Sequence, residues 1–342
     1  MAQKAPRLAL TREQVLGFRQ KTGLLTERLP AAADALRRAA WAGLQDSMPR
    51  AALLSIHARV QGADANICAH GSLVQLWGPR YSDYVVAAKD LAIFSLGRLP
   101  DDDRRRKRAY DTAARLYALL KGERMPFGQA GRAMGVQPNS LRYAAPTGTV
   151  LLRWDGVHQP IIWSSPPPTM EAGEARLELA RRHLHIFGPT TAAAFARWAG
   201  ISTRQAGAAF ERLAPALIAT RTPAGDGWIL AQDEAEAQRG RVNASATVRL
   251  LPSGDAYCLL WGADRELLVP EARQRAQLWT TRVWPGAVLI GGEIAGVWRR
   301  SAASVSMQMW RALSSPEWEA VEREAAALPL PGLKGPISVQ RG

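Results

Sequence analysis

Apolar positions recur at helical spacing in the segment 176–232, between residues that typically start and end helices. An apolar face at i, i+3 and i+4 spacing predicts a helix over 176–187. Thr191 is placed to cap a second helix, Gly200 to end it, and Ser202 to open a third. Two short apolar strands around a Pro/Gly turn follow. This order predicts a winged helix, a helix-turn-helix variant whose third helix can enter a DNA major groove.

The same order of elements recurs upstream, which indicates an internal repeat. Apolar periodicity and helix-ending glycines predict three helices, over 109–121, 127–134 and 138–143. Strands over 149–154 and 157–163 flank Asp155-Gly156, a typical two-residue hairpin turn. The Pro-rich stretch 164–169 is expected to link this second winged helix to the next one.

The N-terminal third has a weaker form of the same pattern. A capping box at 11–14 predicts a helix through Thr22. Further helices are expected over 31–41 and within 43–60, and paired strands over 73–77 and 83–87. These elements are consistent with a first winged helix.

The last third contains short apolar runs between 248 and 298, with a hairpin turn at Gly291-Gly292, and a final helix over 308–328. It is expected to form a small antiparallel, barrel-like β domain. The predicted fold class is therefore α+β, with tandem winged helices followed by this β-rich domain. The expected domains are 1–100, 101–165, 170–235 and 245–330.

Charge indicates the class of partner. The formal net charge is +14, and 38 of the 44 basic residues are Arg. Such a chain favours a polyanion, and double-stranded DNA fits best because Arg makes bidentate contacts with phosphate and guanine. A GC-rich genome would also raise the Arg content. A membrane surface is a weaker alternative, since no basic amphipathic stretch has a clean apolar face.

The sequence gives no indication of a metal site, a cofactor site or a membrane span. Cys68 and Cys258 lack metal-ligand spacing, and His183 and His185 point to different faces of one helix. We therefore expect no metal and no cofactor. No apolar run reaches the 18 or so residues of a membrane span, so we expect a cytoplasmic, nucleoid-associated monomer.

Five stretches carry a resemblance to a known family. They are 43–60, the Leu-Trp-Gly-Pro-Arg run at 76–80, 187–200, 250–257 and 291–300. Together they resemble the bacterial tandem winged-helix DNA-binding family that includes DNA glycosylases which unhook interstrand crosslinks and excise N7-alkylated purines. The resemblance extends from about residue 8 to 330. It implies three winged helices and a C-terminal β-rich domain around duplex DNA, with alkylated or crosslinked duplexes as the expected substrates.

The resemblance also implies catalytic residues. In these glycosylases a Gln-x-Gln or Gln-x-Asp motif positions the water that attacks the anomeric carbon. Gln45 matches the first position and Ser47 occupies the second, with Asp46 between them. Asp46 would point away from Gln45 if the backbone there is extended. The alternative is that Gln45 and Asp46 cap the helix that begins near Pro49.

Several polar residues are candidate DNA contacts. They are Arg50, His57, Arg59, Arg80, Arg142, Arg204, Gln205, Arg299 and Arg300. The charge run 101–108 is expected to be a solvated linker; its acidic half can instead cap the helix that follows, and its basic half can touch phosphate. Asp255 is expected to orient a loop or serve the site. The departure at Ser47 leaves two functions open: a DNA glycosylase with an altered motif, or a non-catalytic duplex-DNA-binding protein such as a transcriptional regulator.

Overall fold

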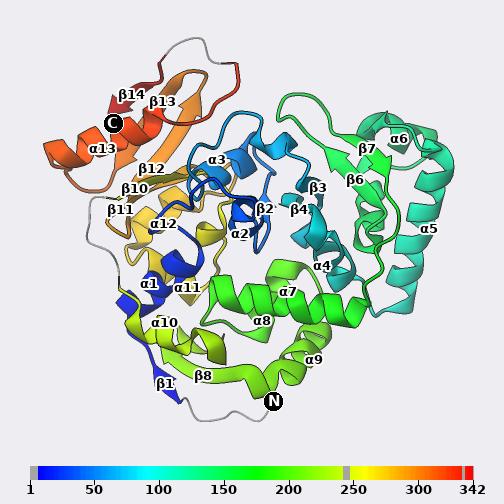
Figure 1. Cartoon of the computed structure of the whole chain (residues 1–342), viewed down its shortest axis with the longest axis horizontal. Coiled ribbons are helices and arrows are strands. Elements are labelled where there is room, and N and C mark those ends of the chain that lie inside the picture. The colour runs from blue at the N-terminus through cyan, green and yellow to red at the C-terminus, as the bar shows by residue number, and fades with distance from the viewer. Residues whose placement is uncertain (1–6, 242–246, 333–335, 342) are drawn as a thin grey trace.

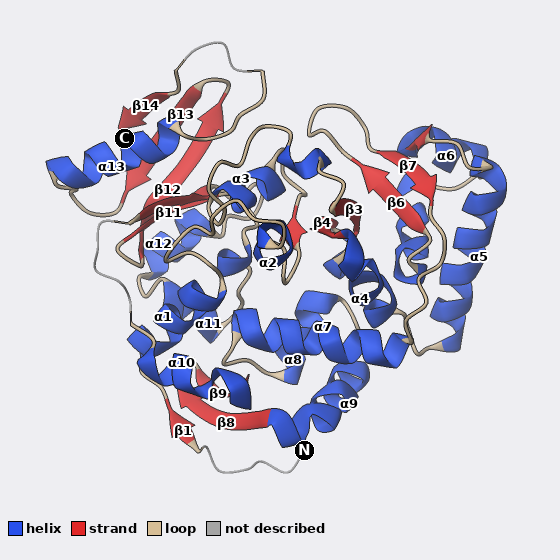
Figure 2. Cartoon of the chain, viewed as in Figure 1, coloured by secondary structure: helices blue, strands red, loops and turns tan. Residues whose placement is uncertain are grey.

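The computed structural model describes residues 7–241, 247–332 and 336–341 of the chain. Helices and strands are mixed along its whole length (Figure 2), in a mixed α/β fold. The helices are α1 Arg12–Thr22, α2 Ala35–Ala39, α3 Ala51–His57, α4 Leu91–Ser95, α5 Asp103–Leu120, α6 Phe127–Ala133, α7 Ala172–Phe187, α8 Ala192–Ala199, α9 Thr203–Leu213, α10 Glu234–Arg239, α11 Ala263–Leu268, α12 Ala272–Leu278 and α13 Ser315–Ala326.

The strands form three sheets. They are β1 Leu8–Ala9, β2 Leu44–Gln45, β3 Leu73–Trp77, β4 Asp83–Ala87, β5 Met125–Pro126, β6 Val150–Arg153, β7 Ile161–Ser164, β8 Leu217–Thr222, β9 Gly225–Leu230, β10 Val248–Leu251, β11 Gly286–Ile290, β12 Glu293–Ser301, β13 Ser304–Met309 and β14 Ser338–Arg341. In Figure 1 the sheet that carries α13 lies at one end of the molecule, and α5 lies at the opposite edge beyond β6 and β7.

One sheet joins the first two expected domains. Its strand order is β2-β4-β3-β6-β7-β5, and β3 meets β6 at the pair Gln75 and Leu152. The Gln75 side chain reinforces this junction, because its oxygen accepts a hydrogen bond from the Trp154 backbone N–H at 2.7 Å. The hairpins predicted separately at 73–87 and 149–163 are therefore halves of one continuous sheet.

The N-terminal segment joins the segment expected to form the third winged helix. Strand β1 pairs in parallel with β8, with Leu8 opposite Thr220. Helix α1 packs on α7 and α10 and buries Phe18 in the same apolar cluster as Phe187. The expected grouping of 1–100 is thus wrong for β1 and α1. Their amphipathic pattern predicts a buried face, and nothing in it specifies which element covers that face.

Local signals predicted helix ends well. The capping boxes at Thr11 and Ser202 are both present, and the Thr191 hydroxyl accepts a hydrogen bond from the Ala194 N–H. Gly200 ends α8 with a left-handed φ of 73°. The strands over 73–77 and 83–87 have the predicted bounds, and Gly291 with its neighbouring glycine connects β11 to β12.

Other element bounds differ from the prediction. The run 101–108 is no linker, because Asp102 caps α5 and the helix begins at once. The turn at Asp155 belongs to a longer loop, since β6 ends at Arg153 and β7 begins at Ile161. The segment 138–143 lies in a 3₁₀ helix, η5, that spans Pro138–Thr147. Residues 304–309 form β13, so the last helix starts later than expected, and α2 is shorter than 31–41.

The C-terminal sheet has the order β10-β11-β12-β13-β14, and its last pair, β13 with β14, is parallel. The expected purely antiparallel sheet is wrong at that edge. A buried ion pair ties the start of this region to α3. The Arg59 guanidinium donates to both Asp255 carboxylate oxygens, at 2.7 and 2.8 Å, and the Ser55 hydroxyl donates to one of them at 2.7 Å.

Burial opposes ionisation of Asp255, but the charge and hydrogen bonds of Arg59 outweigh it and hold the pKa of this carboxyl below its ordinary value. The carboxylate is therefore charged at neutral pH. None of the helices in the described part of the chain is long and apolar enough to cross a bilayer.

Asp255→Asn should destabilise the protein by about 3–5 kcal/mol, because it leaves the Arg59 guanidinium buried without its counter-charge. The free energy of unfolding is measured by urea titration with tryptophan fluorescence. Glu322→Gln is the matched control: it breaks an exposed pair with Arg341 and should cost less than about 1 kcal/mol. Equal losses in the two variants would contradict the structural role of the buried pair.

Candidate active site

Gln45 lies at the end of β2, where β2 pairs with β4 and Gln45 is opposite Tyr84. Its side chain is half-buried, and its Oε1 accepts a hydrogen bond from Arg80 Nη2 at 3.2 Å. Gly254 from the C-terminal region closes over the same side chain. A Cβ added at Gly254 would lie 3.3 Å from Gln45 Nε2, and the φ of Gly254 is +79°. Both the close approach and the left-handed backbone favour glycine there.

Arg80 lies in a tight turn between β3 and β4, the 3₁₀ segment η2 Pro79–Tyr81. Both Arg80 and Tyr81 have positive φ, 55° and 59°, which is strained for residues with side chains. The guanidinium of Arg80 lies over the Trp261 ring at 5.1 Å, so one cation contacts Gln45 and an aromatic face together. Strain of this kind is typical of functional sites.

Asp46 faces the other side of the strand. Its Oδ1 accepts a hydrogen bond from the Ala52 N–H at 2.9 Å, and its Oδ2 accepts one from Gln75 Nε2 at 2.6 Å. Burial raises the pKa of Asp46 to about 7, against the effect of these two hydrogen bonds. Asp46 therefore accepts a hydrogen bond from the first turn of α3, whereas the Gln45 side chain makes no hydrogen bond to that helix. Ser47, the next residue, is exposed.

Two cavities adjoin the motif. One of about 340 Å³ is lined by Asp46, Arg50, Gln75 and Trp154, among others. The second, of about 290 Å³, lies between Pro49 and the C-terminal sheet. Its lining includes Met48, Trp284, Arg299 and Arg300. The structure thus brings three of the predicted DNA contacts, Arg50, Arg299 and Arg300, to the walls of cavities beside the motif.

Other predicted DNA contacts are buried. Arg59 is 3% exposed and is occupied by Asp255. His57 is buried, and burial together with the nearby charge of Arg28 lowers its pKa to about 4, so the imidazole is neutral. Gln205 is 5% exposed and donates to the Leu99 carbonyl. These three side chains cannot reach DNA in this fold, because their polar atoms are enclosed or already hydrogen-bonded.

Two further predicted contacts have protein partners. Arg142 donates to the Tyr81 carbonyl at 3.1 Å and so supports the strained turn beside Arg80. Arg204 is exposed on α9 and pairs with Asp101 at 2.6 Å. Arg142 is thus close to the Gln45 site through the turn, and Arg204 is held at the surface by a carboxylate.

Sequence reasoning missed several residues that surround Gln45 and its partner Arg80. Trp261, Gly254 and Arg265 come from the C-terminal region, and Arg197 comes from α8. Burial, and after it the charges of Arg197 and Arg80, lower the pKa of Arg265. These guanidiniums are therefore close enough to repel one another. Gly254 and Arg197 lie in stretches that carry the resemblance, 250–257 and 187–200, but nothing in the sequence indicates a role for either residue.

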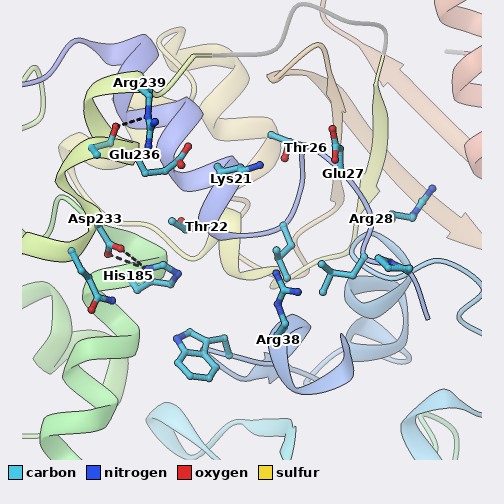
Figure 3. Close-up of a pocket in the computed structure, with 16 residues that line it drawn as sticks. Lys21, Thr22, Thr26, Glu27, Arg28, Arg38, His185, Asp233, Glu236 and Arg239 are labelled. Atoms are coloured by element: carbon cyan, nitrogen blue, oxygen red, sulfur yellow. Dashed lines mark hydrogen bonds and ion pairs between the residues drawn. The ribbon is translucent and has the colours of Figure 1, made fainter. Parts of the chain in front are cut away.

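A separate cavity of about 740 Å³ lies between α1, α2, α7 and α10. Figure 3 shows Arg38 extending into it opposite the hydrogen-bonded pair of His185 and Asp233. Its cations face nearly as many carboxylates, including Glu27 and Glu236. No lining residue is shared with the cavities lined by Asp46 and by Met48.

Within the described ranges, no three His, Cys, Asp or Glu side chains are grouped so that they could hold a metal ion. His183 is buried and hydrogen-bonded to Thr190, while His185 pairs with Asp233, so the two histidines have different surroundings. Cys68 and Cys258 are free thiols, and burial raises the pKa of Cys68 to about 12.

Known proteins share the fold and the sequence pattern of this chain. No curated protein sequence matches the chain. Among solved structures, Streptomyces sahachiroi DNA glycosylase AlkZ has a similar fold: the TM-score is 0.76 at 17% sequence identity, covering 98% of this chain and 100% of that chain. A sequence model of the family described as DNA glycosylase AlkZ-like matches residues 36–329. Since that match covers most of the sequence, the chain belongs to the DNA glycosylase AlkZ-like family.

Proposed function

We propose that this protein hydrolyses the N-glycosidic bond of N7-alkylated purines in duplex DNA, including purines joined in an interstrand crosslink. The observation that carries the proposal is the Gln45 side chain, which accepts a hydrogen bond from Arg80 and against which Gly254 packs. Family membership supports a glycosylase over a regulator. Neither a cofactor nor a metal is needed for this reaction.

Alkylation at N7 gives the purine a positive charge, so the base is already a good leaving group. A water oxygen bonds to the anomeric carbon while the bond from that carbon to the purine N9 breaks. The electron pair of this bond neutralises the base, and the water releases a proton. The enzyme must position the water and stabilise an oxocarbenium-like sugar.

Gln45 is the residue best placed for the water. Its Oε1 accepts from Arg80, which fixes the orientation of the amide, and the same oxygen has a second lone pair for a water proton. Strand β2 ends at Gln45, and Ser47 is an exposed residue in the bend that follows it. We assign Ser47 as a second, shorter polar group at the site and Asp46 as a residue that supports the strand.

The surrounding charge fits duplex DNA. Arg50, Arg299 and Arg300 line the cavities beside the motif, and we propose that they contact phosphates next to the damaged nucleotide. Arg80 is assigned to Gln45 itself. With a net charge of +14, the chain would bind DNA in a strongly salt-dependent manner. We further propose a nucleoid-associated monomer in the cytoplasm.

We propose that three units, each made of helices followed by a hairpin, are winged helices and form the scaffold. The first contains α2, α3 and the β3–β4 hairpin. The second contains α5, α6, η5 and the β6–β7 hairpin. The third contains α7, α8, α9 and the β8–β9 hairpin. The C-terminal sheet supplies the loop that carries Gly254.

Gln45→Ala should slow base release from duplex DNA with N7-methylguanine by about 100-fold, because the attacking water loses its positioning group. Release of free base is followed under single-turnover conditions. Gln61→Ala, which truncates an exposed glutamine, is the control. If both variants release base at the rate of the unmodified protein, Gln45 does not position the water.

Ser47→Gln should increase the rate of base release, since it adds a second long amide two residues after Gln45. The same assay is used at saturating enzyme, with Ser338→Gln as a control for adding a glutamine at an exposed serine of β14. An unchanged or lower rate, with the unfolding free energy unchanged, would contradict this role for Ser47.

Asp46→Asn should change how stability depends on pH. The folded pKa of Asp46, about 7, lies above its unfolded value, so the folded state binds more protons between these two values. Relative to the Asn variant, the unmodified protein therefore gains stability as pH falls from about 7 to about 4, by at most about 1.4 kcal/mol per pH unit. Urea titrations at several pH values test this. A constant difference would mean that the carboxyl stays ionised throughout.

A further inference from the structure

Helix α5 carries a basic groove that the proposed reaction does not use. Arg104, Arg108 and Arg115 are spaced i, i+4 and i+11 and therefore lie on one face of the helix. The groove has a volume of about 840 Å³ and runs between this face and the segment that follows α6. Its other lining residues include Arg105, Lys107, Thr112, Met134, Val136 and Ser140.

These arginines keep their positive charge available. In the described ranges of the chain, no carboxylate forms an ion pair with Arg104, Arg105, Arg108 or Arg115. The two acidic residues of the groove have other partners: Asp102 caps the helix, and Asp111 pairs with Lys107 at 2.9 Å. The groove is therefore strongly cationic, in contrast to the cavity of Figure 3, where carboxylates nearly balance the cations.

Two arginines of the groove are held in place by neighbouring residues. The Arg108 guanidinium lies over the Tyr143 ring at 3.4 Å, and Arg115 donates to the Met134 carbonyl at 2.7 Å. Neither partner carries a charge. Both contacts order an arginine without neutralising it, which is the arrangement that binding an anion requires.

A chain of contacts connects the groove with the Gln45 site. The Tyr143 ring, beneath Arg108, makes an edge contact with the Tyr81 ring at 5.7 Å. Tyr81 follows Arg80, which donates to Gln45. In Figure 1 helix α5 lies at the outer edge of the molecule, on the side away from the C-terminal sheet. The groove and the Gln45 site are thus linked through the turn that holds Arg80 and Tyr81.

We propose that the α5 groove binds the sugar-phosphate backbone of the same duplex, on one side of the damaged nucleotide. At a rise of 1.5 Å per residue, the stripe from Arg104 to Arg115 is about 16 Å long. That length matches roughly five base-pair steps of 3.4 Å. The contacts are to phosphates and so do not depend on sequence. This inference rests on the proposed function, because it takes the duplex to lie at Gln45.

The test compares the double variant Arg104→Gln/Arg105→Gln with Arg239→Gln/Arg323→Gln, which removes the same charge from exposed positions on α10 and α13. Fluorescence anisotropy measures binding to an undamaged duplex of about three helical turns and to one of about one turn. The slope of log K against log salt on the longer duplex should decrease by about 1 for each arginine removed. The affinity loss should be about tenfold at moderate salt and confined to the longer duplex.

Three results would overturn the proposal. They are equal slopes in the double variant and the unmodified protein, equal losses in the control variant, or an affinity loss that is as large on the short duplex. Because the probe is undamaged DNA, the result does not depend on catalysis. Absence of base release in the Gln45 assay, with α5-dependent binding intact, would reject the proposed reaction and leave the groove as a DNA-binding surface.

Discussion

The site depends on one buried ion pair, Arg59 with Asp255. The two residues are 196 positions apart in the sequence, and the pair fixes the turn that contains Gly254 against the end of α3. Gly254 in turn lies against the Gln45 amide. Without this constraint, the C-terminal region would have no fixed distance from the motif strand. Removing two charges from water costs about as much free energy as their attraction returns at such burial. The main effect of this pair is therefore to fix the position of the C-terminal region relative to α3, and its net contribution to stability is small.

Local structure was predictable from the sequence because its causes are local. The hydroxyls of Thr11 and Ser202 cap helices wherever those helices pack, and Gly200 adopts a left-handed conformation that other residues resist. The partner of an amphipathic face is a different matter. Nothing in the pattern of α1 distinguishes α7 from a neighbour in the first hundred residues. The boundaries of the domains were therefore harder to predict than the helices and strands themselves.

The same distinction applies to the site. Gln45 was found through the resemblance, and the alternation of extended backbone predicted that Asp46 faces away from it, as the structure shows. Arg59 and Gln205 were assigned to DNA because their residue types suit it, although both are buried. The type of a residue indicates which hydrogen bonds and ion pairs its side chain can form. Whether solvent or another chain can reach it depends on contacts that are distant in sequence, which is also why Trp261 was missed.

The pairing of β1 with β8 has a consequence for synthesis on the ribosome. Helix α1 buries its apolar face against α7, which lies about 160 positions later, and against α10, which lies about 220 positions later. At a translation rate of about 5–20 residues per second, that face waits on the order of 10–40 s for both partners. During this interval Val15, Leu16 and Phe18 are exposed in the nascent chain. An N-terminal fragment released early would present the same apolar surface. The N-terminal helix can therefore reach its folded position only after the second half of the chain has been synthesised.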